Sequence, residues 1–393
     1  MPANSPEFLA SIDAAAPAML ERLITWANTN SGSDNTEGLL TMGALIESAI
    51  AELGVPVDRI PIAPDGRFAL RAVRRGRTGR SVLLNGHFDT VYGPAHPFQQ
   101  CHPPTDDDRL RGPGVADMKG GIVILIEALR AFENSPAAPD IGWEVLLTPD
   151  EETGSVLSAP LLRESARHHD IGIVFEAALP DGSIVASRKG VGVVRVEAHG
   201  RAAHAGRDFA HGRNAIAALA EFVVAADHLN GQIPDIVVNA GAISGGGTLN
   251  IVPDHATAAF NLRADRADDG EETLRRLRAA ATEIGRRREV TLTLEGGFSR
   301  PPMELTEAKR PWIDAWCACA ARLGLRIGHG HTGGGSDANI LTAAGLPCID
   351  GAGVEGGELH SEREWMRPSS LARRARIAAL FLHEFARGRI PAA

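Results

Sequence analysis

The stretch that decides the fold is Ser81–Thr90, with the sequence SVLLNGHFDT. Its apolar first half, Val82–Leu84, predicts a short buried strand that ends at Gly86. The turn after it contains His87 and Asp89, and an imidazole beside a carboxylate suits metal binding, because the acid can hold the second ring nitrogen. A polar turn that merely caps a strand would have the same sequence, so this stretch alone does not decide the function.

The length and charge of the chain indicate how many domains it has and exclude some classes of protein. With 393 residues, the chain exceeds what one hydrophobic core usually organises, and two domains are expected. A net charge of -9 argues against nucleic acid or an anionic membrane as a partner. No apolar run approaches the roughly 20 residues of a membrane-spanning helix, and the N-terminus lacks the features of a signal peptide. We therefore expect a cytoplasmic protein.

Strands and helices alternate around the opening stretch. Apolar runs that predict strands occur at residues 143–147 and 171–175, and helical patterns occur at 122–132 and 156–168. This alternation indicates an α/β domain with a mostly parallel sheet covered by helices on both faces. In such sheets, ligands bind beyond the carboxyl ends of the strands.

The pattern changes near residue 187. From there to residue 294 the predicted order is strand, helix, strand, strand, helix, strand, which is the ferredoxin-like order of an independent α+β unit. After Pro302 the α/β pattern resumes. We therefore predict a catalytic domain in two parts, residues 1–188 and 300–393, with a smaller domain inserted at residues 189–299.

Two imidazoles and three carboxylates occur at or near the predicted strand ends and in glycine-rich turns: His87, Asp117, Glu152, Glu176 and His360. This ligand set is expected for two divalent cations that share one carboxylate. Asp117, held between glycine-rich segments, is the natural bridge. His87 and Glu176 would then complete one site, and Glu152 and His360 the other.

Two further acids have predicted roles in this site. Glu151 precedes a ligand and should point elsewhere, so it is available as the general base that moves a proton from the attacking water to the leaving nitrogen. Asp89 would orient the ring of His87. Two zinc ions fit these nitrogen and oxygen ligands, and cobalt or manganese could fill the same set.

Ordered motifs along most of the chain resemble the M20 family of co-catalytic zinc peptidases: GHFDT, GPGVADMKGG, TPDEETGS, HAG, TGGGSDAN and ELHSE. The resemblance is strongest to the glutamate carboxypeptidase branch. It implies that the five residues above hold the metals and that Glu151 is the base. It also implies a cis peptide bond between Asp117 and Met118.

The inserted domain resembles the lid and dimerisation module of the same family. By this resemblance His204 reaches the active site of the partner subunit, and Asn250 and Arg263 hold the substrate's carboxylate. Backbone N–H groups of Gly333, Gly334 and Gly335 can serve the same anion. Arg300 either contributes to that site or lies in a hinge.

The expected function is hydrolysis of an amide bond by a homodimeric di-zinc enzyme. The substrate would be a small acylated amino acid or peptide, and the product a C-terminal amino acid, with glutamate favoured. An N-acyl-amino-acid deacylase or a dipeptidase with the same metal core is the alternative. A metal-stabilised binding protein without turnover is the rival from another class.

Overall fold

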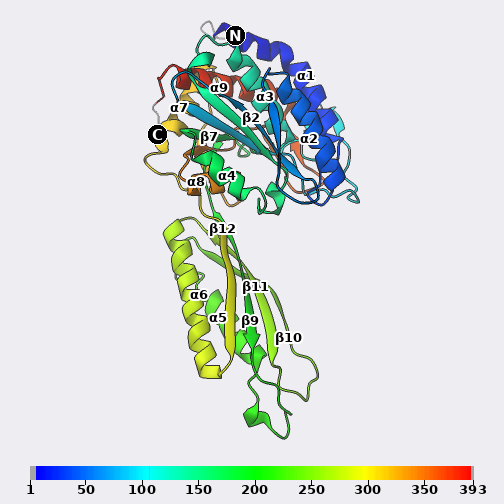
Figure 1. Ribbon diagram of the computed structural model, residues 1–393, viewed down its shortest axis with the longest axis vertical. Coiled ribbons are helices and arrows are strands. Elements are labelled where there is room, and N and C mark those ends of the chain that lie inside the picture. Colours follow the sequence, from blue (N-terminus) through cyan, green and yellow to red (C-terminus); the bar gives the residue numbers. More distant parts are fainter. Residues whose placement is uncertain (1–5, 106, 391–393) are drawn as a thin grey trace. The chain divides into compact units, whose positions relative to one another are not determined.

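The computed structural model describes residues 6–105 and 107–390, which form a mixed α/β fold (Figure 1). The chain divides into two compact units. Unit 1 comprises Met1–Ser187, Leu305–Thr332 and Ser336–Ala393, and unit 2 comprises Arg188–Glu304 and Gly333–Gly335. The three glycines, which the sequence places in the second part of the catalytic domain, therefore pack with unit 2.

A six-stranded sheet forms the centre of unit 1, in the order β1-β2-β6-β3-β7-β14. The opening stretch is β3 (Ser81–His87), which lies parallel to its neighbours β6 (Gly142–Thr148) and β7 (Ile171–Val174). β14 (Cys348–Ile349) continues the parallel part. β1 (Val57–Pro61) and β2 (Phe68–Arg74) are antiparallel, because only a short loop joins them. The sheet is therefore mixed.

Helices cover both faces of this sheet. Val82 and Leu84 share one core with five helices, whereas Leu83 points to the other face and is also fully buried. On that other face, α4 (Ala159–Ala166) contacts α8 (Asp337–Ala343), which in turn contacts β7. The described helices contain no segment long and apolar enough to cross a bilayer. The five helices of the first core are α1 (Ala10–Ala27), α2 (Thr36–Ala51), α3 (Lys119–Glu133), α7 (Arg310–Arg322) and α9 (Pro368–Ala386).

The start of α3 lies directly against the end of β7. A Cβ atom on Gly121 would lie 1.9 Å from the carbonyl oxygen of Phe175, so only glycine permits this approach. This close packing brings together the segment before α3, which contains Asp117, and the segment after β7, which contains Glu176. The peptide bond between Asp117 and Met118 is cis, as the family resemblance implies.

The segment after β3 contributes two buried aromatic side chains, Tyr92 and Phe98. Tyr92 and Phe98 are 3% and 5% exposed and pack edge to face. Burial of Tyr92 is possible because its hydroxyl donates to Glu364 and to the carbonyl oxygen of Ser361. Short strands form two further small sheets. One contains β4 (His102–Thr105), β5 (Arg109–Arg111), β15 (Gly356–Gly357) and β16 (Trp365–Met366), and the other pairs β8 (Ile184–Arg188) with β13 (His329–Thr332).

Unit 2 has its own antiparallel sheet, in the order β10-β11-β9-β12. The side chains of β9 (Gly190–His199) point alternately to the two faces of the sheet. Val194, Val196 and Ala198 are buried against the helices, whereas the residues between them are exposed. The elements occur along the chain as β9 (Gly190–His199), α5 (Ala215–Asp227), β10 (Val237–Gly245), β11 (His255–Ala264), α6 (Ala267–Arg288) and β12 (Thr291–Arg300).

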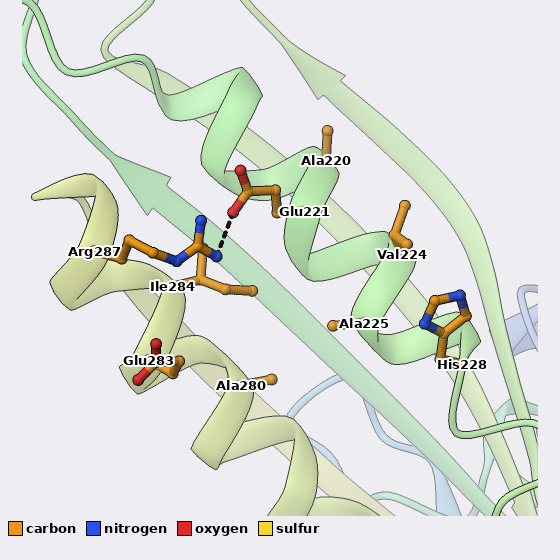
Figure 2. A pocket seen from close by; sticks show the side chains of 9 residues that line it. All are labelled: Ala220, Glu221, Val224, Ala225, His228, Ala280, Glu283, Ile284 and Arg287. Carbon is orange, nitrogen blue, oxygen red and sulfur yellow. Dashed lines mark hydrogen bonds and ion pairs between the residues drawn. The ribbon is translucent and has the colours of Figure 1, made fainter.

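An open pocket of about 550 Å³ lies between α5 and α6 (Figure 2). Val224 and Ile284 form part of its apolar wall, and an ion pair of 2.7 Å between Arg287 and Glu221 lies at its edge. None of the site residues predicted from sequence lines it.

Candidate metal centre

The five predicted metal ligands all belong to unit 1 and follow or precede its regular elements. His87 is the last residue of β3, and Glu176 follows β7. Asp117 lies just before α3, Glu152 lies in the helical turn after β6, and His360 lies between β15 and β16. Parallel strands deliver their carboxyl ends to one edge of the sheet, and this explains why distant residues meet there.

These residues form two groups that share Asp117. In the first group, Nε2 of His87 lies 3.1 Å from Oδ1 of Asp117 and 3.5 Å from Oε1 of Glu176. In the second, Nε2 of His360 lies 3.2 Å from Oδ2 of Asp117 and 3.1 Å from Oε2 of Glu152. Within each group, each residue offers one ligand atom, and these atoms lie within 4.8 Å of one another. The structure therefore contains a candidate ligand cluster for two metal ions, in two groups that share Asp117.

The acids of this cluster favour positive charge at its centre. Hydrogen bonds to Asp117 and Glu152 raise the pKa of His360 to about 11. Burial opposes the protonation of His87, but its contacts with Asp117 and Asp89 raise its pKa well above the ordinary value. Burial and the charge of Asp117 raise the pKa of Glu152. Because the carboxylates stabilise cationic imidazoles here, they would also stabilise bound divalent cations, and the nitrogen and oxygen donors fit such ions.

Asp89 is fully buried and connects His87 to the turn after β6. Its Oδ1 lies 3.2 Å from Nδ1 of His87 and accepts a hydrogen bond from the backbone N–H of Glu151. Its Oδ2 accepts hydrogen bonds from the hydroxyl of Ser33 and the backbone N–H of Glu152. One carboxylate can therefore fix both the ring of His87 and the positions of two adjacent glutamates.

Glu151 lies beside the cluster. Its Oε2 is 3.9 Å from Nε2 of His87, and the residue is 6% exposed. Among the described residues, it belongs to neither of the two ligand groups. This is the position that a proton-transferring group beside the ligands should have.

His360 differs from the other four candidate ligands in two ways. Its backbone has φ of 59°, in the left-handed region that residues other than glycine adopt uncommonly. Its side chain is 55% exposed, whereas those of the other ligands are nearly buried. The cluster therefore faces solvent on the side of His360.

Glu364 is a buried acid that the sequence motifs do not identify. Its Oε1 accepts hydrogen bonds from the backbone N–H groups of Ala116 and Asp117, and its Oε2 accepts them from Gly114 and from the hydroxyl of Tyr92. Burial and the charge of Asp117 raise the pKa of Glu364 to about 7. Glu364 thus holds the loop that presents the shared ligand. Nothing in the sequence separates it from the exposed glutamates nearby.

Three of the predicted substrate-binding residues, Arg263, Arg300 and Gly335, gather at one end of unit 2. Arg263 of β11 and Arg300 of β12 both pair with Val191 of β9, one on each side. Gly335 packs against Val191 and Arg300, since a Cβ there would lie 2.8 Å and 3.3 Å from their side chains. Burial and the neighbouring charge of Arg300 lower the pKa of Arg263. Two guanidinium groups brought together in this way favour a bound anion.

His204 and Asn250 lie at the other end of the same sheet. The backbone N–H of Ala205 donates to the carbonyl oxygen of Asn250, so the two segments adjoin. They lie beyond the ends of β9 and β11 where His199 pairs with His255, opposite the Val191 end. At about 3.3 Å per residue, roughly 25 Å of strand separates them from Arg263. In one copy of unit 2, Asn250 and Arg263 therefore cannot hold the same carboxylate.

Comparisons with known proteins agree on one family. The model of peptidase family M20/M25/M40 matches residues 83–384. Carboxypeptidase G2 of Pseudomonas sp. (strain RS-16) is 27% identical over 95% of this chain and 90% of its own length. Succinyl-diaminopimelate desuccinylase of Delftia acidovorans is 31% identical over 76% of this chain and 81% of its own length.

The fold agrees as well. The Bacillus subtilis YXEP protein, described as a dinuclear metal-binding peptidase from the M20 family, superposes with a TM-score of 0.70. The match covers 97% of this chain and all of that chain, at 14% sequence identity. With the family match extending over most of its length, the chain belongs to peptidase family M20/M25/M40 and is a hydrolase of that family.

Proposed function

We propose that this protein is a di-zinc amidohydrolase that releases a C-terminal amino acid from an N-acyl or peptidyl substrate. The observation that supports this most directly is the pair of three-residue ligand groups that share Asp117. Asp117 would hold both ions, with His87 and Glu176 on one and Glu152 and His360 on the other. When bound, two such ions polarise a carbonyl group and lower the pKa of water. Cobalt or manganese would fit the same donors.

Glu151 is the proposed proton carrier. It takes a proton from the water that attacks the scissile carbonyl and gives it to the departing nitrogen. Its side chain lies at the border of the ligand cluster, within 3.9 Å of a ligand imidazole. Asp89 holds the ring of His87 and the backbone of Glu151, so it keeps the proton carrier beside the ligands.

The cluster of Arg263, Arg300 and Gly333–Gly335 is the proposed site for the carboxylate of the released amino acid. An arginine fork pairs with a carboxylate at two points. Two adjacent arginines suit a product with two carboxylates, such as glutamate. The likeness to carboxypeptidase G2 supports the release of a C-terminal amino acid.

We assign residues 189–299 as the lid and dimerisation domain, and residues 1–188 and 300–393 as the catalytic domain. His204 and Asn250 of one copy would complete the site of a second copy, His204 by stabilising the oxyanion. Their separation from Arg263 in the same unit supports this assignment. The enzyme would act in the cytoplasm as a homodimer.

A deacylase is the second candidate. The desuccinylase relative at 31% identity favours it, because the metal cluster would be the same and only the pocket would differ. In both reactions an amide bond is hydrolysed beside a carboxylate.

Product analysis separates these candidates. The metal-reconstituted protein is incubated with N-acylglutamates, N-acetyl amino acids, N-succinyl-diaminopimelate and dipeptides, and the released amines are identified by mass spectrometry. We expect glutamate to be released fastest. Preferred hydrolysis of the succinyl substrate would assign the deacylase reaction, and no turnover above that of the metal-free protein would refute both.

A further inference from the structure

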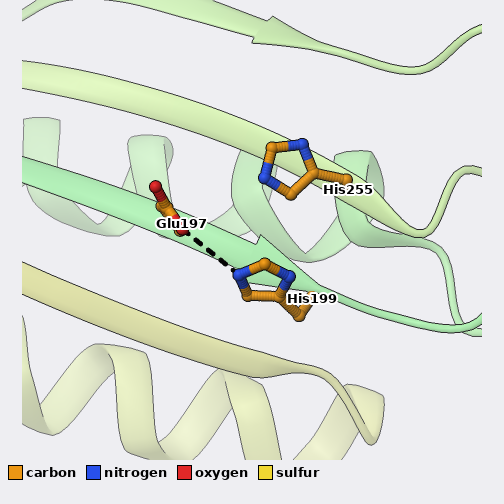
Figure 3. A group of neighbouring side chains, drawn as sticks. All are labelled: Glu197, His199 and His255. Atoms are coloured by element: carbon orange, nitrogen blue, oxygen red, sulfur yellow. Dashed lines mark hydrogen bonds and ion pairs between the residues drawn. The ribbon is translucent and has the colours of Figure 1, made fainter.

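A second group of metal-ligand side chains lies on the exposed face of the unit 2 sheet (Figure 3). It consists of Glu197 and His199 on β9 and His255 on β11. His255 pairs directly with His199 across the antiparallel strands, and Glu197 precedes His199 by two residues. Directly paired residues, and residues two apart on one strand, point to the same face of a sheet. The fold therefore brings these three side chains together.

The distances are close to those of a metal site. Each of the three side chains offers one ligand atom, and these three atoms lie within 4.8 Å of one another. The two imidazole centroids are 5.1 Å apart, and Nε2 of His199 lies 3.2 Å from Oε2 of Glu197. Tetrahedral ligands about 2.0–2.1 Å from zinc are about 3.3 Å from one another. Exposed side chains can reach that spacing by small rotations.

The surroundings leave the group open to solvent. On the far side of β9, Thr291 pairs with His199 and Thr293 pairs with Glu197, so small uncharged side chains occupy the next strand. The side chains of His199 and Glu197 are 52% and 58% exposed. A bound ion would have three protein ligands and an outward position for water or for a group from another molecule.

We propose that Glu197, His199 and His255 form a surface site for a divalent transition-metal ion, separate from the ligand cluster of unit 1. Two imidazoles and one carboxylate select zinc, copper, nickel or cobalt over calcium and magnesium, which prefer oxygen ligands. The ion would join β9 and β11 at the end from which the segments of His204 and Asn250 extend. The backbone N–H of Gly200 already donates to the carbonyl oxygen of Asp254 there, 2.8 Å away.

Zinc binding to the full-length protein tests this site. After removal of metal with a chelator, zinc is titrated back, and bound zinc per chain is measured by elemental analysis. The variant H199Q/H255Q should bind about one equivalent less than the wild type. The matched control H211Q/H228Q, which removes two exposed histidines from the same unit, should bind as much as the wild type.

Two further measurements separate this site from the cluster of unit 1. In an Asp117→Asn background, which lacks the shared ligand, a zinc ion should still be retained and should be lost when H199Q/H255Q is added. In crystals soaked with zinc, an anomalous peak should lie about 2.0–2.1 Å from nitrogens of His199 and His255. Equal zinc binding by the wild type and H199Q/H255Q, or no such peak, would overturn the proposal.

Discussion

Glu151 and Glu152 are neighbours in sequence but lie differently in the site. Glu152 contacts His360 and belongs to a ligand group, whereas Glu151 lies beside His87 and belongs to neither group among the described residues. Their backbone N–H groups bind the two oxygens of Asp89. A small helical turn thus gives two identical side chains different surroundings, and this difference can be tested.

Replacement of Glu151 by Gln should abolish proton transfer without loss of metal. We expect turnover to fall about 10²–10⁴-fold, as for removal of a general base. Elemental analysis should show the metal content of the wild type. The matched variant Glu152→Gln should instead lose bound metal, and full activity of Glu151→Gln would refute the assignment of the base.

Glu364 holds the backbone of Asp117, the proposed shared ligand. Its two oxygens accept hydrogen bonds from three N–H groups and one hydroxyl, so the amide of a Gln would turn an N–H₂ group toward donors. We expect Glu364→Gln to weaken metal affinity about 10–100-fold. A chelator competition assay measures this affinity. Glu362→Gln, at an exposed position in the same turn, is the control and should bind metal normally.

At the scale of elements, β6 is held to its neighbours by a buried acid. Glu144 lies within 3.1 Å of Arg71 on β2 and of His169, and it accepts a hydrogen bond from Ser165. Burial opposes the ionisation of Glu144, but His169, Ser165 and Arg71 together hold its pKa below the ordinary value. The carboxylate therefore stabilises the folded protein at neutral pH.

The lowered pKa of Glu144 determines how the free energy of unfolding depends on pH. Because the folded protein binds the proton of Glu144 less readily than the unfolded chain, its stabilisation is present above the unfolded value of 4.5 and is lost as pH falls through the folded value. Glu144→Gln should lower the free energy of unfolding by about 1–3 kcal/mol at pH 7. The difference from the wild type should shrink in acid. Urea unfolding at several pH values measures it, with Glu164→Gln as the exposed control.

Element boundaries show what periodicity can predict. The strands and helices whose positions were predicted from apolar patterns lie within a few residues of those positions, including β3, β6, β7 and α3. The sequence patterns did not reveal β5, β15 and β16, because strands of two or three residues are too short for an alternating pattern. The antiparallel part of the main sheet depends on loop length, which apolar patterns do not describe.

At the scale of the whole molecule, the separation of His204 from Arg263 leads us to predict that two inactive variants restore activity when mixed. If His204 serves the site of the partner subunit, the variants Glu151→Ala and His204→Ala should complement each other. A heterodimer would have one site with both residues intact. Random reassociation of a 1:1 mixture should give about one quarter of wild-type activity.

Each variant alone should be nearly inactive, and size-exclusion chromatography should show that both remain dimers. Activity in the mixture no greater than the average of the two variants would show that His204 acts within its own chain, or not at all. A mixture of Glu151→Ala with Asp117→Ala, which both disable unit 1, is the control and should remain inactive.

The sequence by itself determined the identity of the candidate ligands, because imidazoles and carboxylates stood at recognisable strand ends and in ordered motifs. It also determined the order of elements, since apolar periodicity is a local property. Tertiary structure alone decided which side chains are neighbours across strands: Arg263 and Arg300 on either side of Val191, and His199 opposite His255. It also decided that Glu364 is buried beneath Asp117. These relations depend on strand register and long-range packing, which join residues far apart in the chain and leave no local pattern in the sequence.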